Sequence, residues 1–145
     1  MERNIRHVVA DINGLAPRIP DDLDLDRLQA LAEEYFALPE APVHLDVWFR
    51  LYERFPDSDG HGVFWTILHG IEGQPGNEKF VVASVQRNPT HFAVLMVNRL
   101  LNGGIASVGD VDLIGLLQSV SVDERYPGSI RQDAEGYLSH QRNRA

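Results

Sequence analysis

Side chains able to do chemistry are concentrated between residues 57 and 73. His61 precedes a strongly apolar segment, His69 lies within it, and Glu72 follows His69 at a spacing of three. A histidine and a glutamate three residues apart share one helix face, as metal ligands carried on one helix often do. The pattern is not His-Glu-x-x-His, and no second matching pair occurs in the sequence. We therefore favour structural or surface histidines and predict no metal site.

Other forms of catalysis also lack a candidate. The chain has no cysteine and no Gly-x-Ser-x-Gly segment, and its serines have no evident base nearby. It has no Walker loop and no dinucleotide-binding fingerprint after a predicted strand. Asp57 and Asp59 suit a turn better than an acid–base pair. We therefore expect a protein that is not an enzyme and binds no cofactor, and keep a metal-dependent enzyme using His61, His69 and Glu72 as an alternative.

The same stretch has the composition of a protein-binding surface. An aromatic side chain among acids is suited to a partner that brings arginine and lysine, although Trp65 taken alone is more readily interpreted as core. A second acidic segment spans residues 21–26, where helix capping and a solvated helix face are the alternative explanation. The candidate partner-binding residues are Asp21, Asp22, Asp24, Asp26, Asp57, Asp59, His61, Trp65, His69 and Glu72.

Helical periodicity accounts for most of the chain, because apolar residues recur at i, i+3, i+4 and i+7. The segment that holds Trp65 and His69 is apolar around most of its circumference, which predicts a central helix covered on several sides. Gly73 is expected to end it in a left-handed conformation. Thr90 and Asp110 are expected to cap the sixth and the seventh helix. Residues 105–109 are predicted as a connector, with a short strand as the alternative. The helices are predicted at about 3–13, 21–38, 44–55, 63–72, 78–87, 91–102, 111–121 and 127–140.

A weak internal repeat suggests how these helices are arranged. Arg54-Phe55-Pro56, Arg87-Asn88-Pro89 and Arg125-Tyr126-Pro127 each close one helix and precede the next. An isolated helical hairpin cannot bury its apolar face, whereas stacked hairpins share a continuous core. We predict an all-α fold of about seven or eight helices in stacked antiparallel hairpins, similar to HEAT repeats or an α-solenoid. An irregular helical bundle is the alternative.

Length and composition favour a single domain. The 145 residues are 43% hydrophobic, which is enough to bury a core. The sequence contains no apolar run of 18 residues, so we expect no membrane span. The N-terminal segment lacks the apolar region of a secretory signal. The absence of cysteine fits the cytosol. We expect a cytoplasmic protein. Its predicted parts are acidic N-terminal helices at 1–40, a helical-hairpin stack at 43–140 and a frayed basic tail at 141–145.

The net charge of −8 is unevenly distributed. Residues 1–60 hold 13 acids against 6 bases, a net of −7, whereas residues 61–145 hold 8 acids against 7 bases, a net of −1. Direct binding of nucleic acid is not expected, because it needs clustered lysine and arginine. An acidic half attracts a basic protein partner, with plain solubility as the alternative explanation. The sequence does not predict an oligomeric state.

Four short motifs lie between residues 45 and 140: Arg54-Phe55-Pro56, GVFWTILHGIE at 62–72, SVQRNP at 84–89 and VNRLLNGG at 97–104. In their order and composition they resemble helical immunity proteins of bacterial polymorphic or contact-dependent toxin systems. The resemblance implies a cytosolic protein that binds and neutralises a cognate toxin domain, often a nuclease. A nuclease cleft is basic because it holds phosphate, so the acidic balance is compatible with this function. A helical-repeat adaptor without a toxin partner is the alternative.

Overall fold

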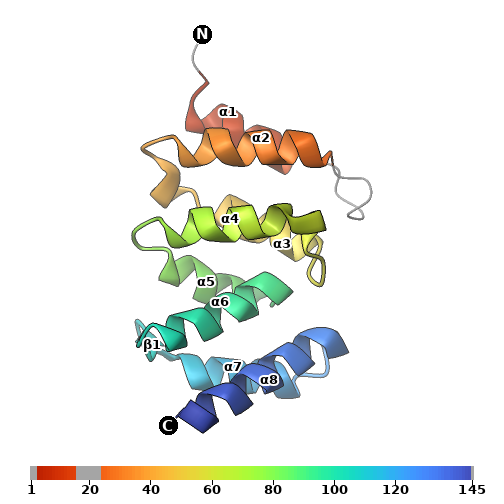
Figure 1. Cartoon of the computed structure of the whole chain (residues 1–145), viewed down its shortest axis with the longest axis vertical. Helices are drawn as coiled ribbons and strands as arrows, with labels where there is room; N and C mark the ends of the chain where they lie inside the picture. Colours follow the sequence, from red (N-terminus) through yellow and green to blue (C-terminus); the bar gives the residue numbers. More distant parts are fainter. Residues whose placement is uncertain (1–2, 16–23, 145) are drawn as a thin grey trace. The chain divides into compact units, whose positions relative to one another are not determined.

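A computed structural model describes residues 3–15 and 24–144 of the chain (Figure 1). Within these ranges the structure contains eight α-helices and a single two-stranded hairpin, which confirms the predicted all-α fold. Contacts along the chain define two compact units, Met1–Asn77 and Glu78–Ala145. The prediction of a single domain over 1–145 stays a prediction.

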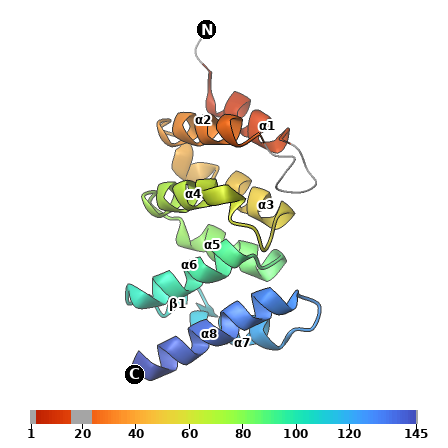
Figure 2. The same ribbon diagram turned by 45° about the vertical axis from the view of Figure 1, so that its right-hand side comes forward.

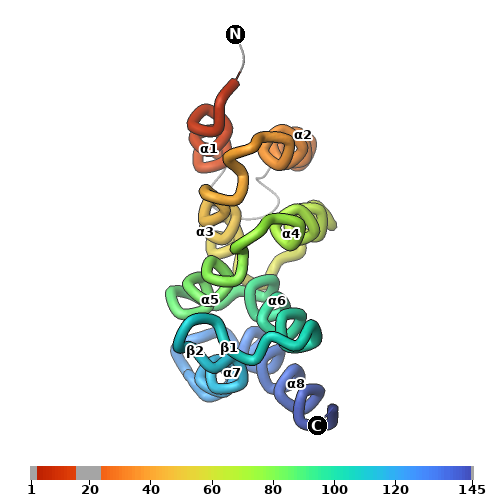
Figure 3. Tube along the Cα trace, turned by 90° about the vertical axis from the view of Figure 1, so that its left-hand side faces the viewer, coloured from red at the N-terminus to blue at the C-terminus, as the bar shows by residue number. Residues whose placement is uncertain are grey.

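The first unit consists of two helical hairpins, α1–α2 and α3–α4 (Figure 3). Helix α1 packs against α2 and α3, and α2 packs against α4. The acidic N-terminal helices, which the sequence sets apart from the hairpin stack, therefore share one unit with α3 and α4. Its elements are α1 (Ile5–Asn13), α2 (Leu25–Phe36), the 3-10 turn η2 (Ala41–Val43), α3 (Asp46–Arg54), the 3-10 turn η3 (Gly60–Gly62) and α4 (Val63–Glu72).

Aromatic side chains join the helices of the first unit. Trp48 of α3 is fully buried, with the ring of Phe36 stacked on it at 5.7 Å and the ring of Tyr35 edge-on at 5.3 Å. Tyr52 is also buried, and its hydroxyl donates a hydrogen bond to the carbonyl oxygen of Phe64 at 3.0 Å. Because aromatic side chains bury large areas, these contacts dominate the core between α2, α3 and α4.

Helix α4 is buried along one face only, contrary to the prediction of a central helix covered on several sides. Trp65 is 40% exposed, so the interpretation of this residue as core is also wrong. Trp65 shares the outer face of α4 with Thr66 and His69. The polar side chains of Thr66 and His69 favour water, which keeps this face exposed. Gly73 ends the helix as predicted, but in a right-handed conformation with a φ of −76°. The buried residues of α4 are Phe64, Ile67, Leu68 and Ile71.

The second unit also contains two helical hairpins. Helix α6 packs against α5, α7 and α8, and α7 and α8 form the most extensive helix pair of this unit. Thr90 caps α6 as the sequence predicts, since its hydroxyl accepts a hydrogen bond from the backbone N–H of Ala93 at 3.1 Å. The elements are α5 (Glu78–Arg87), α6 (His91–Asn102), β1 (Ser107–Val108), β2 (Val111–Asp112), α7 (Leu113–Val122) and α8 (Gly128–Arg144).

A small β-hairpin precedes α7 and corrects the predicted helix start. Val108 pairs with Val111, and Gly109 adopts a φ of 59° in the turn between them. Asp110 therefore lies in a hairpin turn and does not cap α7. The cap is Asp112, whose carboxylate accepts a hydrogen bond from the backbone N–H of Gly115 at 2.8 Å.

The last helix continues to Arg144, whereas the sequence predicts a frayed tail from residue 141. Gln141 Nε2 donates hydrogen bonds to Oδ1 of Asn98 at 2.7 Å and to Oδ1 of Asn102 at 2.9 Å. Arg144 Nη1 donates to the same Asn102 oxygen at 2.8 Å. These bonds, which α8 donates to side-chain oxygens of α6, hold the final turn of α8 in the helix.

The Arg-x-Pro motifs do not share one structural function. The guanidinium of Arg54 donates hydrogen bonds to the carbonyl oxygens of Ile12 and Leu15, each at 3.1 Å, at the C-terminal end of α1. Arg125 instead pairs with the carboxylate of Asp123, two residues before it. The similarity of these two motifs therefore reflects local sequence and not a repeated contact.

Candidate protein-binding surface

Helices α2 and α4 begin at the same end of the first unit (Figures 1 and 2). Phe36, the last residue of α2, lies against Gly70 in the second half of α4, as two parallel neighbouring helices require. The start of α2 and the turn between α3 and α4 are therefore at one end of this unit. Two acidic segments that are far apart in the sequence contribute to that end.

We call this region the acidic end surface. It combines exposed acids at the start of α2, the exposed turn before α4 and two exposed rings on the outer face of α4. Asp21 and Asp22 lie outside the described residues. Glu72 is half-buried in the last turn of α4, at the opposite end of that helix, and does not belong to the surface. The residues of the surface are Asp24, Asp26, Asp57, Asp59, His61, Trp65 and His69.

Two of these acids have a structural function. Asp24 Oδ1 accepts a hydrogen bond from the backbone N–H of Arg27 at 3.0 Å and caps α2, and Asp59 Oδ1 accepts one from the backbone N–H of His61 at 3.0 Å. Asp26 and Asp57 are exposed, and neither accepts a capping bond in the part of the chain that the structure describes. Asp26 and Asp57 are therefore the acids best placed to serve a partner.

The turn before α4 has an unusual backbone. Gly60, His61 and Gly62 have φ values of 57°, 52° and 92°, and His61 is the one non-glycine residue with positive φ in the described ranges. A Cβ at Gly60 would lie 2.5 Å from the ring of Phe64, so the turn is tightly packed beneath. Strained residues of this kind often cluster at functional sites. The packing fixes His61 at an exposed turn directly before α4.

An exposed aromatic pair extends the surface along α4. The ring centroids of Trp65 and His69 are 6.3 Å apart, with an angle of 34° between the ring planes. The two residues are one helical turn apart, so both rings lie on the same outer face. A large aromatic side chain presented beside acids has the composition of a binding hot spot.

Two other types of site find no support in the residues that the structure describes. Among the residues that the structure describes, no group of three or more histidine, cysteine, aspartate or glutamate side chains is placed to hold a metal ion. In the same residues, no helix combines the length and the apolar character needed to cross a membrane. Neither finding adds a residue to the acidic end surface.

Sequence reasoning missed a polar pocket between α6 and α8 in the second unit. It has a volume of about 560 Å³ and is lined by residues such as Asp133, Gly136, Tyr137 and His140. These four residues follow one another at spacings of three, one and three along α8, so they lie on one face of the helix. This spacing is visible in the sequence and could have indicated a polar face. The apolar stripe of this helix concealed the polar residues beside it.

Comparison with known proteins identified no relative. No protein-family model, no curated protein and no solved structure matches the chain. Its function is therefore inferred from its own residues and from the motifs described above.

Proposed function

We propose that this chain is an immunity protein that binds and neutralises a basic toxin domain in the cytoplasm of a bacterium. The observation that carries the proposal is the acidic end surface, where exposed Trp65 follows a turn with positive φ values and exposed acids lie at the same end of the unit. The sequence motifs between residues 45 and 140 support the same function by resemblance. The all-α fold is compatible with it.

The charge of the surface suits a toxin that acts on nucleic acid. A nuclease must hold phosphate, and its cleft therefore carries lysine and arginine. Carboxylates such as Asp26 and Asp57 can pair with those cations and raise the rate of association. The excess of acids in residues 1–60 extends this attraction beyond direct contact, since the summed charge steers a partner from a distance.

Trp65 supplies the apolar contact that charge alone lacks. Exposed acids contribute mainly to association rate and specificity, whereas hot spots are enriched in tryptophan that becomes fully desolvated. His61 and His69 lie four residues before and four residues after Trp65 in the sequence. We expect Trp65 to enter a pocket of the toxin and the acids to surround it.

The first test is co-expression of the chain with the protein encoded immediately upstream, scored by cell survival and co-purification. Rescue together with a stable complex supports the proposal. Absence of both would remove it and leave the adaptor alternative, for which a broad pull-down identifies partners.

Variants then connect the complex to the surface. Trp65→Ala should weaken the complex about tenfold or more, and so should the pair Asp26→Lys with Asp57→Lys. Neither of these acids accepts a capping bond in the described residues, so their reversal removes no helix cap. The matched control reverses two exposed acids of the second unit, Glu124→Lys with Glu135→Lys, and should keep wild-type affinity. Equal effects in both charge-reversed pairs would contradict the assignment of the acidic end surface.

A further inference from the structure

Helix α8 contains a glycine that internal packing does not explain. Apart from Gly128, the first residue of α8, three glycines lie in α-helices of the described ranges, at 70, 115 and 136. A Cβ at Gly70 would meet the ring of Phe36 at 2.4 Å, and one at Gly115 would lie 3.2 Å from the capping carboxylate of Asp112. A Cβ at Gly136 would have no atom of a described residue within 4 Å. Because glycine destabilises a helix interior relative to alanine, Gly136 is costly to the fold, and no contact with the residues that the structure describes compensates for it.

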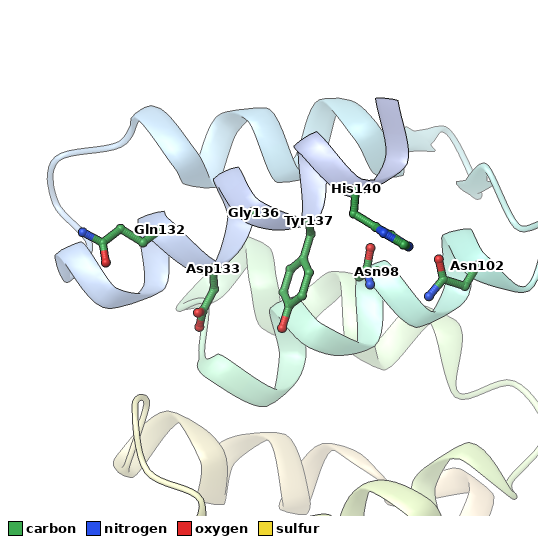
Figure 4. Close-up of a pocket in the computed structure, with 7 residues that line it drawn as sticks. All are labelled: Asn98, Asn102, Gln132, Asp133, Gly136, Tyr137 and His140. Atoms are coloured by element: carbon green, nitrogen blue, oxygen red, sulfur yellow. The ribbon is translucent and has the colours of Figure 1, made fainter. Parts of the chain in front are cut away.

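The open space at Gly136 belongs to the α6–α8 pocket, the polar pocket of about 560 Å³ described above (Figure 4). This volume lies in the range of about 300–1,000 Å³ that is typical of ligand sites. A side chain at position 136 would occupy the pocket. The glycine therefore keeps it open at the expense of helix stability.

One end of the α6–α8 pocket offers an acceptor and an aromatic face. Asp133 is half-buried, and its Oδ2 atom is 2.7 Å from Nδ1 of His91. Its second oxygen receives no hydrogen bond from any residue that the structure describes. Tyr137, one turn along α8, is also half-buried and lines the same pocket (Figure 4). A carboxylate beside a tyrosine ring is a suitable site for a guanidinium, which bonds the first and stacks on the second.

The other end offers donors. Gln141 Nε2 donates hydrogen bonds to the side-chain amide oxygens of both Asn98 and Asn102. In the described residues, the amide N–H groups of these two asparagines are bonded to no acceptor, and both residues line the pocket. Asn98 is only 7% exposed, so its amide is held in place. Such donors are suited to a carbonyl oxygen of a peptide backbone.

We propose that the α6–α8 pocket binds an arginine residue within an extended peptide segment of a partner protein. The guanidinium pairs with Asp133 and stacks on Tyr137, while a backbone carbonyl accepts from Asn98 or Asn102. Lysine is a poorer ligand, because its ammonium is a point charge without the planar face with which a guanidinium stacks on Tyr137. Residues 78–145, which contain the pocket, hold seven acids and seven bases, so the attraction comes from the Asp133 carboxylate itself and not from an acidic surface around it. This site is independent of the toxin proposal.

The test is a proton–nitrogen NMR titration of the full chain with acetyl-Gly-Arg-Gly-amide. The expected result is saturable shifts of the Gly136 backbone amide and of the side-chain amides of Asn98 and Asn102. The matched probe replaces arginine by citrulline, which has nearly the same shape without the charge, and should bind at least tenfold more weakly. Equal binding of the two peptides, or no shift of these signals, would overturn the proposal.

Variants separate occupation of the pocket from loss of fold. Gly136→Leu should abolish the shifts at Asn98 and Asn102 while raising the melting temperature by about 2–8 °C, because the helix gains propensity. Ser139→Leu, at an exposed position of the same helix, is the control and should keep binding. Unchanged binding by Gly136→Leu would contradict the site.

The contribution of the Asp133 charge is tested with the same peptide titration. Asp133→Asn keeps an acceptor for His91 and should weaken the arginine peptide about tenfold or more. Glu135→Gln makes the same charge change at an exposed position outside the pocket and should leave affinity unchanged. If both variants lose affinity equally, the binding is non-specific attraction and the pocket assignment fails. Failure of the toxin complex would leave this titration unchanged.

Discussion

The ring of Phe36 lies directly against Gly70, so that a Cβ at position 70 would be 2.4 Å from the Phe36 Cε2 atom. Phe36 cannot easily move away, because its ring is stacked on the fully buried Trp48. The absence of a side chain at Gly70 is therefore what allows α2 and α4 to approach. Since both helices begin at the acidic end of the unit, this pair also positions the candidate surface.

Gly70→Ala should destabilise the first unit by about 1–3 kcal/mol through overpacking, despite the gain in helix propensity. Urea denaturation followed by circular dichroism measures the change. Gly73→Ala is the matched control, since a Cβ there would lie 3.5 Å from the nearest atom, the carbonyl oxygen of Gly70. Adding Phe36→Leu to Gly70→Ala should recover part of the loss. An additive double variant would show that the ring is not the obstacle.

Arg54→Met should destabilise the fold by about 1.5–3 kcal/mol, because two hydrogen bonds from a charged group to the end of α1 are lost. Burial lowers the pKa of this guanidinium from its usual value, which agrees with a partly desolvated position. Arg50→Met removes an exposed arginine of the same helix, paired with Asp46 at a spacing of four, and should change stability by no more than about 0.5 kcal/mol. Urea midpoints compare the two, and equal losses would contradict the capping function.

Alkaline pH should unfold the chain through two buried tyrosines. Burial raises the pKa of both Tyr35 and Tyr52, with Glu72 adding to the increase at Tyr52. Their hydroxyls donate hydrogen bonds to the carbonyl oxygens of Ala41 and Phe64. The folded state therefore favours the neutral phenol. This contribution to stability is complete below the unfolded pKa of about 10 and is lost as pH rises above it.

Simultaneous absorbance and circular dichroism check this prediction. The tyrosinate signal of these two residues should appear together with loss of helix above pH of about 10. The variant Tyr35→Phe with Tyr52→Phe should lose stability less steeply over the same range. Full tyrosinate absorbance with an intact helical spectrum would contradict the burial argument.

The fold was more predictable from the sequence than the sites, because helical periodicity is local. The apolar stripes identified all eight helices of the described ranges, although the predicted start of α7 and the predicted end of α8 differ from the structure. Thr90 was correctly expected to cap α6. The coverage of α4 was not predictable, because an apolar helix with Trp65 on its outer face has the same pattern as a fully covered one. Which face is covered depends on partners such as Phe36, which lie elsewhere in the chain.

The sites required information about long-range packing. That Asp26 and Asp57 lie at one end of a unit follows from the parallel packing of α2 and α4, which no local pattern encodes. In the α6–α8 pocket, Gln141 of α8 donates hydrogen bonds to Asn98 and Asn102 of α6, a contact between two helices that no local pattern predicts. Gly136 was a visible signal, since a glycine inside a predicted helix calls for a reason, but that reason lies in the space around it.

The start of α7 provides a test of local structure against sequence pattern. Both Asp110 and Asp112 precede the helix, and the sequence alone favoured the first. Pairing of Val108 with Val111 places Asp110 in the hairpin turn and leaves Asp112 to accept the N–H bond of Gly115. Asp112→Ala should therefore cost about 1 kcal/mol of stability through loss of the cap, whereas Asp110→Ala should cost less than about half of that, as exposed substitutions usually do. Thermal unfolding of the two variants ranks them, and the reverse order would mean that α7 begins at Val111 in solution, in place of β2.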